Sequence, residues 1–250
     1  MNKLAMLTLA AALAVPVAFA QTNDAQLQAS VRKALSSSSF KEVQVSVQNG
    51  IVTLSGSVPL FANKLTAEQK VRHVKGIGAV RDQIQVAGAT VPDAQLQQKI
   101  QKAIAYDLWG NVPVQFQAVA VQVHDGVVTL NGFTAGPIAA SDTVAVVANT
   151  KGVKDIVDNI QVDPLSPMDN QLRVAVFRKV YSNPMLSQYV MDPEKPIRIQ
   201  VMNGHVTLYG TVDSEAQKNV AGIQANSVAG VFSVTNDLQV AGQPSEHAQK

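Results

Sequence analysis

Cysteine is missing from all 250 residues of the sequence, which excludes disulfide bonds, cysteine-ligated zinc and acylation at a cysteine. An excess of one charge is missing as well, because 20 Lys and Arg residues face 18 Asp and Glu residues. The resulting net charge of +2 does not indicate an acidic polymer such as nucleic acid as a partner. Beyond the N-terminus, no apolar run reaches the roughly 20 residues that a membrane-spanning helix needs.

Residues 1–20 have the pattern of a secretory signal peptide. Lys3 precedes an almost wholly apolar run from Leu4 to Val17, and Ala18-Phe19-Ala20 forms a small-x-small cleavage site. We therefore expect cleavage before Gln21, and a mature protein in the periplasm without a lipid anchor.

The rest of the sequence contains one pattern three times: NGIVTLSG at 49–56, DGVVTLNG at 125–132 and NGHVTLYG at 203–210. In each copy a further glycine follows 26 residues after the first. The nine repeated glycines are Gly50, Gly56, Gly76, Gly126, Gly132, Gly152, Gly204, Gly210 and Gly230. So strict a spacing is typical of one supersecondary unit used repeatedly. We expect domains at 24–88, 93–164 and 169–242, followed by a C-terminal tail at 243–250.

Each copy begins with a pattern that predicts an amphipathic helix. Asp24, Asp93 and Asp169 each precede apolar residues at helical spacing, and aspartate is a favourable N-cap because its carboxylate accepts from free backbone N–H groups. We expect these three residues to be N-caps.

A β-hairpin is predicted next, because Asn-Gly or Asp-Gly between β-branched runs favours a two-residue type I′ turn. In the first copy this turn places Val47 opposite Val52 and Val45 opposite Leu54, with the apolar side chains on one face. The matching positions of the other two copies follow the same register.

A second helix and a last strand complete each copy. The strand carries a polar residue at the same phase each time, Asp82, Asp158 or Asn236, which we interpret as a structural residue that binds backbone at a strand edge. The predicted fold class is therefore α+β: three tandem αββαβ domains, each a three-stranded sheet with two helices packed on one face.

The repeated pattern V-x-V-x-[ND]-G-x-V-T-L-x-G, followed by a helix and by G-V-x-x-V-x-[ND]-x-[IL]-x-V, resembles the BON domain. A signal peptide followed by tandem copies is similar to the hyperosmotically inducible periplasmic proteins. The resemblance implies an αββαβ fold, envelope localisation, no catalytic activity and a role in contacting phospholipid membranes or other envelope components.

No catalytic constellation, metal site or cofactor site is predicted. The four histidines, His73, His124, His205 and His247, occupy non-equivalent positions and lack metal-ligand spacing with another histidine or a carboxylate. A glycine-rich phosphate loop and a nucleophile elbow are both absent. We therefore expect a protein that is not an enzyme.

Two sets of residues are candidates for contact with a membrane or a partner. The helix-to-turn stretch is longer in the second copy than in the first, and it brings Tyr106, Leu108 and Trp109, the only tryptophan. Aromatic residues of this kind suit an interface with lipid headgroups, but they also suit packing against the protein's own core. The longer stretch of the third copy, residues 181–191, holds two Tyr and two Met and has the same two interpretations.

The second set is basic, because residues 24–88 carry eight Lys and Arg against four Asp and Glu. It consists of Lys64, Lys70, Arg72 and Lys75. Near an anionic membrane each such residue contributes roughly 1 kcal/mol, although the same residues also suit an ordinary solvated helix face.

We expect an envelope stress protein that binds anionic phospholipid surfaces peripherally. The alternative is a protein-interaction scaffold or chaperone-like adaptor that contacts envelope proteins, for which exposed strand edges would serve.

Overall fold

The structure is a computed structural model that describes residues 17–88, 90–107 and 114–242. The first repeat consists of α1 (Val17–Ala34), η1 (Ser38–Phe40), β1 (Val43–Gln48), β2 (Ile51–Val58), α2 (Phe61–Arg72) and β3 (Ala79–Val86). The second consists of α3 (Asp93–Asp107), η2 (Val114–Phe116), β4 (Gln117–His124), β5 (Val127–Thr134), α4 (Pro137–Ala148) and β6 (Asp155–Val162). The third consists of α5 (Pro167–Tyr181), η3 (Ser187–Val190), β7 (Arg198–Met202), β8 (His205–Val212), α6 (Glu215–Asn226) and β9 (Ser233–Val240).

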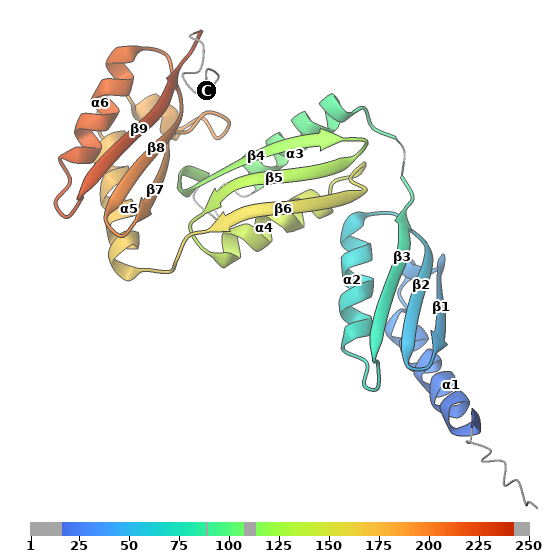
Figure 1. The fold of residues 1–250 in the computed structure, drawn as a ribbon. Coiled ribbons are helices and arrows are strands. Elements are labelled where there is room, and N and C mark those ends of the chain that lie inside the picture. The colour runs from blue at the N-terminus through green and yellow to red at the C-terminus, as the bar shows by residue number, and fades with distance from the viewer. Residues whose placement is uncertain (1–16, 89, 108–113, 243–250) are drawn as a thin grey trace, which may run out of the picture. The chain divides into compact units, whose positions relative to one another are not determined.

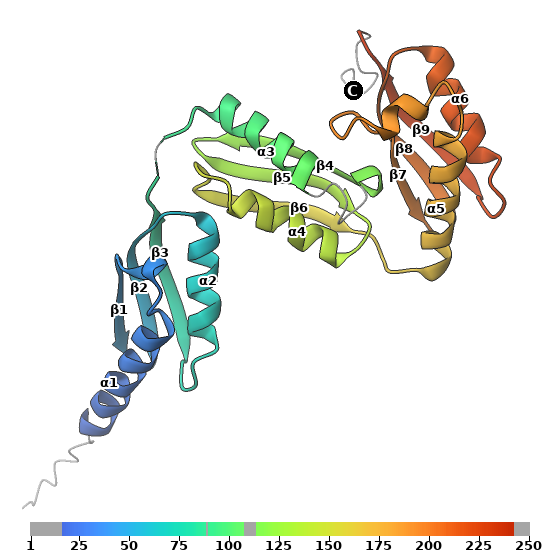
Figure 2. The ribbon, with the colours of Figure 1, turned by 180° about the vertical axis from the view of Figure 1, so that it is seen from behind.

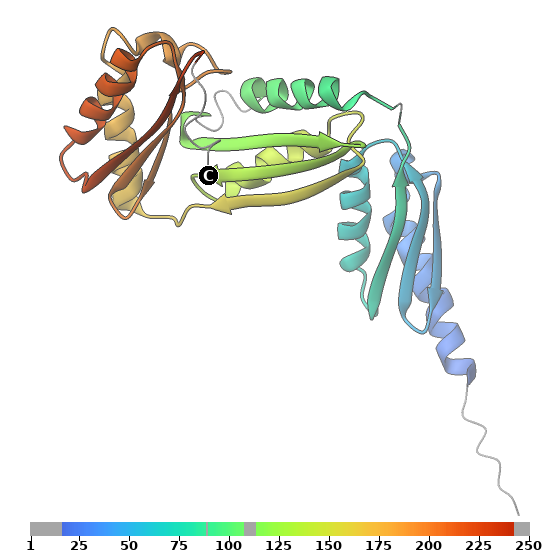
Figure 3. The ribbon, with the colours of Figure 1, turned by 45° about the horizontal axis from the view of Figure 1, so that its top comes forward.

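Each repeat is a two-layer αββαβ unit, as the sequence predicts. The hairpin strands are antiparallel, and the strand that follows the second helix pairs with the middle strand, in parallel for β5–β6 and β8–β9. The sheet β4–β6 is in front in Figure 1, and its helices α3 and α4 are in front in the opposite view of Figure 2. In Figure 3 the gold α5 and the red-orange α6 lie side by side on the third sheet.

The chain divides into two compact units, and each is described by itself. Of the described residues, one unit holds those up to 58 and 63–85, which make up most of the first repeat. The other holds 59–62 and the described residues from 86 onward, and therefore contains both the second and the third repeat. In the described part of the chain, none of the helices combines the length and the apolar character that crossing a bilayer demands.

The predicted hairpin register is confirmed. Val45 pairs with Leu54 and Val47 with Val52, and the same register holds in the other two hairpins. Both turn residues have positive φ in every copy, 52° at Asn49 and 73° at Gly50 in the first. This is the geometry of a type I′ turn, which explains why Asn-Gly or Asp-Gly recurs at this point.

The second repeated glycine is required by a close backbone approach. A Cβ atom added at Gly56 would lie 1.9 Å from the carbonyl oxygen of Glu42, and one added at Gly132 would lie 1.9 Å from that of Ala118. Both glycines also have φ near or above +100° (99° and 131°), a conformation that L side chains rarely adopt.

Each repeat has its own apolar core between the helices and one face of the sheet. The ladder residues of the middle strand are fully buried in every copy, with Leu54, Leu130 and Leu208 all at 0% exposure. Burial of such a side chain contributes about 1.5–3 kcal/mol, so these strands supply much of each repeat's stability.

The expectation that the aspartates are N-caps is wrong. Asp24 lies inside α1 and Asp93 is the first residue of α3. Asp169 is the third residue of α5, where Ser166 is the N-cap and its side chain accepts from the N–H of Asp169. The reason is that all three carboxylates are used elsewhere, by the hairpin turns.

In the first repeat the N–H groups of Asn49 and Gly50 donate to the two carboxylate oxygens of Asp24 at 2.7 and 2.9 Å. Asp93 accepts from the next hairpin turn at 2.8 and 3.0 Å, and Asp169 from the third at 3.0 and 2.8 Å. We call this contact the turn clamp. It joins the first helix of each repeat to its hairpin by charge-assisted hydrogen bonds.

The interpretation of the polar residues in the last strands is confirmed. Asp82 accepts from the N–H of Ile84 at 2.8 Å, and Asp158 accepts from that of Ile160 at 2.9 Å. These strands are at the edge of their sheets, so the side chains occupy backbone donors that another strand would otherwise use.

Candidate functional site

Tyr106 is the one described residue of the predicted aromatic anchor. It lies near the end of α3, is 54% exposed, and its hydroxyl donates to Glu194 Oε1 at 3.2 Å. The hydrogen bond to this carboxylate, together with its charge, raises the pKa of the Tyr106 hydroxyl. Leu108 and Trp109 lie outside the described residues.

The predicted basic residues do not share one face. Lys70 and Arg72 are two positions apart in α2, which corresponds to about 200° around an α-helix. Arg72 is paired within the helix with Glu68 at 2.6 Å, and Lys75 follows the end of α2. Lys70 and Lys75 are exposed and Lys64 is half-buried.

The long stretch of the third repeat divides between core and surface. Tyr181 and Tyr189 belong to the apolar core, where the Tyr181 hydroxyl donates to the carbonyl of Ile197 at 2.8 Å. Burial raises the pKa of Tyr181 well above its ordinary value. Met185 and Met191 remain exposed, at 45% and 78%. For the two tyrosines, packing against the repeat's own core is the correct interpretation.

A buried polar cluster joins the second and third repeats. Asp163 follows β6 and Arg173 lies in α5, and each is 3% exposed. An Asp163 oxygen lies 3.8 Å from Arg173 Nη2, while Gln200 donates to the other oxygen at 2.8 Å. Arg173 Nη2 also donates to the carbonyl of Val201 at 3.1 Å.

The charges of this cluster carry a desolvation cost. Desolvation raises the pKa of the Asp163 carboxyl, although the hydrogen bond from Gln200 and the charge of Arg173 lower it. Desolvation also lowers the pKa of the Arg173 guanidinium. Asp163 Oδ2 and Arg173 Nε have no hydrogen-bond partner among the described residues. The 3.8 Å from Asp163 Oδ2 to Arg173 Nη2 is too long for a hydrogen bond.

Aromatic rings extend the same interface. Phe116 of η2 meets Phe177 of α5 edge to face, with ring centroids 5.9 Å apart, and the Arg173 guanidinium lies 5.9 Å from the Phe116 ring centroid. Phe133 of β5 meets Tyr209 of β8 at 5.3 Å. Such pairs contribute about 0.5–1.5 kcal/mol beyond the area they bury, so the two repeats are joined by apolar and polar contacts together.

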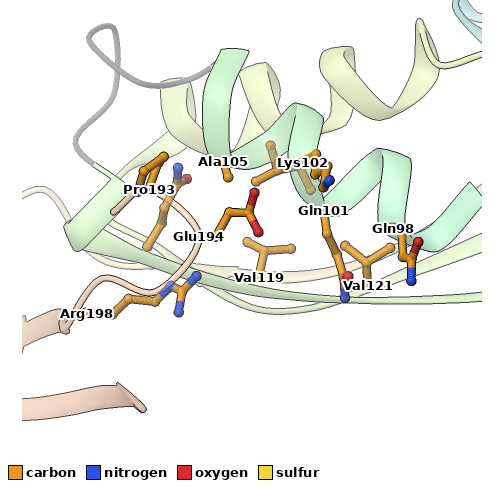
Figure 4. A pocket seen from close by; sticks show the side chains of 11 residues that line it. Gln98, Gln101, Lys102, Ala105, Val119, Val121, Pro193, Glu194 and Arg198 are labelled. Carbon is orange, nitrogen blue, oxygen red and sulfur yellow. The ribbon is translucent and has the colours of Figure 1, made fainter. Parts of the chain in front are cut away.

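A cavity of about 500 Å³ lies in this unit between α3, β4 and the segment that precedes β7. Figure 4 shows Gln101 and Lys102 projecting from α3, Val119 and Val121 from the strand below, and Glu194 between the two layers. Its volume lies within the range of small-molecule pockets, which is about 300–1,000 Å³.

The cavity exists where β4 continues beyond the common pattern. The β1–β2 ladder ends at the pair Val43–Gly56, whereas the β4–β5 ladder has two further pairs after the equivalent Val119–Gly132. The last of them places Gln117 on the apolar face of the ladder. Gln117 is 3% exposed, and neither atom of its amide has a hydrogen-bond partner among the described residues.

Arg198, the first residue of β7, lines this cavity from the third repeat. It also lines a second hollow of about 730 Å³ on the other face of the β4–β6 sheet. Desolvation lowers the pKa of the Arg198 guanidinium.

One group of potential metal ligands occurs in the described chain, where Asp93, His124 and Asp125 have ligand atoms within 4.8 Å of one another. The spacing of these residues in the sequence does not indicate a site, because Asp93 precedes the other two by about thirty positions. Both oxygens of Asp93 are engaged in the turn clamp, and the His124 and Asp125 side chains are 91% and 86% exposed. The clamp accounts for this arrangement.

Sequence reasoning missed Gln117, Glu194 and Arg198. The sequence does contain a signal for Gln117. Val119, Val121 and Val123 alternate along one face of the strand, and Gln117 is a polar residue at the next position of that apolar face. The other two residues had no local signal, because only the packing of the third repeat on the second brings them to the cavity.

Comparison with known proteins gives three kinds of match. The model of the BON domain matches residues 23–88, 92–164 and 169–242. The osmotically-inducible protein Y of Escherichia coli (strain K12) is 29% identical over 124 residues, which is 48% of this chain and 61% of that protein's length. Among solved structures, CdsD, a structural protein of the type III secretion system of Chlamydia trachomatis, is 14% identical, with 89% of this chain and 95% of that chain covered.

The TM-score to CdsD is only 0.24, and a similarity at that level supports no conclusion about this chain. The domain matches, in contrast, coincide with three αββαβ units of the same register. They cover most of the sequence, and the protein belongs to the BON domain family.

Proposed function

We propose that this protein is a non-enzymatic periplasmic protein of the cell envelope that acts under osmotic stress by contacting anionic phospholipid surfaces. The observation that carries the proposal is the run of three BON domains, together with the similarity to a relative that is named osmotically inducible. The expected signal peptide supports the location, because it would deliver the mature chain to the periplasm.

The contact with lipid is assigned to the two sets of residues found in the sequence. Tyr106 is exposed at the end of α3, immediately before the segment that contains Leu108 and Trp109. Lys70 and Lys75 are exposed in the first repeat. Aromatic residues at the headgroup level and cations above an anionic leaflet contribute separately to peripheral binding.

Cosedimentation with vesicles tests this proposal. The mature protein should pellet with phosphatidylglycerol vesicles at low salt and remain in solution with phosphatidylcholine vesicles. Binding should weaken as salt rises, because the Debye length falls from about 10 Å at 0.1 M to about 3 Å at 1 M. The single tryptophan should show a blue-shifted emission when the vesicles are added.

Variants separate the two contributions. Trp109→Ala should abolish the emission change and reduce binding, and Lys70→Gln with Lys75→Gln should weaken binding by about fivefold per residue. Lys151→Gln is the matched control, since Lys151 is an exposed lysine of the second repeat. No pelleting with phosphatidylglycerol at low salt would remove the proposal.

A second candidate function is a protein-interaction scaffold, which is favoured by the edge strand β6. Six of its eight residues are exposed, including Val157 at 44% and Val162 at 45%. An exposed strand edge can accept an extended segment of a partner, here at the backbone groups of β6 other than the Ile160 N–H that Asp158 occupies. Crosslinking in periplasm that returns one stoichiometric partner through β6, with no vesicle binding, would favour the scaffold.

A further inference from the structure

The cavity between α3, β4 and the segment before β7 contains charges of opposite sign that do not pair. Arg198 and Glu194 both line it, yet no ion pair within 4.0 Å joins them. Among the described residues, the Arg198 guanidinium has neither a hydrogen bond nor an ion pair, although desolvation acts on it strongly enough to lower its pKa. Arg198 is half-buried, and a guanidinium that is partly desolvated and lacks a partner carries a cost, so this position favours an oxyanion.

Glu194 provides the opposite charge. Its side chain accepts from the Tyr106 hydroxyl at 3.2 Å, and its N–H donates to Asp192 Oδ1 at 2.9 Å. These contacts hold the carboxylate at the cavity, where Figure 4 shows it between α3 and the sheet. Among the described residues no second hydrogen bond to this carboxylate is formed, so its remaining acceptor positions can take a donor such as an ammonium group.

Gln117 is an independent observation that points to a ligand in the cavity, because its buried amide has no hydrogen-bond partner among the described residues. An unpartnered buried amide costs about 1–3 kcal/mol, and most buried polar groups in proteins are hydrogen-bonded. Gln117 lines the cavity on the same face as Val119 and Val121, where an apolar side chain would continue the core at no such cost. Core packing therefore does not explain a glutamine here.

From these observations we infer that the cavity binds a small zwitterion, with its oxyanion on Arg198, its ammonium group on Glu194 and its apolar part against Val119 and Val121. The shared chemistry is an oxyanion and an ammonium group a few bonds apart. It occurs in free amino acids and in the ethanolamine headgroup of a phospholipid. The inference does not depend on the proposed membrane contact, because Arg198, Glu194, Val119 and Val121 take no part in that contact. Tyr106 is common to both only through its hydrogen bond to Glu194.

Titration of the full mature protein followed by ¹⁵N NMR tests the inference. L-leucine and glycerophosphoethanolamine are the two zwitterionic probes, and 4-methylpentanoate is the matched control, because it keeps the alkyl chain and carboxylate of leucine without the ammonium group. At least one zwitterion should cause saturable shifts of the Arg198 Nε–H and Gln117 side-chain signals. The control should bind at least about tenfold more weakly, because a charge-assisted hydrogen bond is lost.

Variants assign the two charges. Arg198→Gln and Glu194→Gln should each weaken binding at least about tenfold. Arg178→Gln and Glu215→Gln, which change exposed residues of α5 and α6 away from the cavity, should leave it unchanged. Circular dichroism checks that each variant folds. If a variant does not fold, the saturable side-chain shifts of the unsubstituted protein still test the inference.

The outcomes are distinct. Binding of leucine indicates a free amino acid as ligand, and binding of glycerophosphoethanolamine alone indicates the lipid headgroup. No saturable shift with either probe at tens of millimolar, equal affinity for 4-methylpentanoate, or binding that survives both cavity variants would overturn the inference. Vesicle binding that fails while a soluble probe binds would remove only the proposed membrane function.

Discussion

The first and third repeats have the same topology and hairpin register but differ in whether polar and charged side chains are buried. All eight buried polar or charged residues of the described chain lie between Gln115 and Arg173, in the second repeat, at its junction with the third, or in the first helix of the third. In the first repeat the ion pair of the described residues, Arg72 with Glu68, is on the surface, with 65% and 31% of the side chains exposed.

This difference shows what a shared interface adds to a repeated domain. The first repeat encloses an apolar core of its own, and none of the charged residues described in it is fully buried. The second and third repeats belong to one compact unit, and their contact buries Asp163 and Arg173 together with aromatic rings. The cavity with its unpaired charges is part of the same junction.

The largest expected effect comes from Gly56→Ala in the first repeat. The new Cβ would lie 1.9 Å from the carbonyl oxygen of Glu42, so the hairpin must open, at a cost of about 5 kcal/mol or more in the free energy of unfolding. At the equivalent Gly210 the nearest atom, the carbonyl oxygen of Pro196, is 2.7 Å away, and a smaller loss is expected. Urea unfolding of both variants would measure the difference, and equal losses would contradict the geometry.

Asp163→Ala should destabilise the unit that contains the second and third repeats by about 3–5 kcal/mol, because it removes the carboxylate that forms the buried ion pair with Arg173. Differential scanning calorimetry should show a lower transition temperature for that unit and an unchanged transition for the first repeat. A double variant, Asp163→Leu with Arg173→Met, should recover much of the loss, since apolar side chains avoid the desolvation cost. If the double variant is no more stable than the single one, the buried ion pair contributes a net stabilisation that apolar side chains do not replace.

Asp169→Asn tests the turn clamp and its pH dependence. Desolvation alone would raise the pKa of Asp169, but the N–H groups of Gly204 and Asn203, Ser166 and the charge of Arg173 together hold it below the ordinary value. Its stabilisation is therefore complete above the unfolded pKa, about 3.9, and is lost as pH falls through the lower folded pKa. We expect the variant to lose about 1.5–3 kcal/mol at pH 7 and a shrinking amount below pH 4.

The same change at Asp24 sharpens the comparison between repeats. Asp24 makes the same two hydrogen bonds at 2.7 and 2.9 Å, but it is half-buried rather than buried. Asp24→Asn should therefore cost less than Asp169→Asn in urea unfolding at pH 7, because water competes for an exposed charge. An equal cost would indicate that burial is irrelevant to the clamp.

The smallest effect is expected for Arg72→Ala, which removes the surface ion pair with Glu68. Exposed pairs of this kind contribute about 0–1 kcal/mol. Calorimetry at low salt should show a loss of stability of this size, and the loss should disappear in 1 M salt because the charges are then screened. A loss comparable to that of Asp163→Ala would contradict the distinction between the two ion pairs.

Much of the fold was predictable because its signals are local. Asn49-Gly50 requires positive φ at both positions, and that requirement specified the turn, the register and the buried face at once. The helix starts were predicted less well. An aspartate before an apolar stretch has the same local appearance whether it caps its own helix or binds a turn 25 residues away, and Asp24 binds the turn.

The candidate site was predictable only in part. The sequence drew attention to Tyr106, but the partner of its hydroxyl, Glu194, lies 88 positions further along the chain. Gln117 interrupts an apolar alternation, which was a visible signal, whereas nothing near Arg198 distinguishes it from a surface arginine. For these residues the function of the side chain depends on a neighbour from another repeat.

The sequence by itself determined the three repeats, their αββαβ topology and their hairpin registers, because glycines with positive φ and period-two alternation act over a few residues. Only the tertiary structure decided where the carboxylates of the turn clamps bind, which charges are buried, and that Arg198 and Glu194 line one cavity without forming an ion pair. Burial and the distance between charges depend on contacts between segments far apart in the chain. These contacts set the local dielectric environment, which no short pattern encodes.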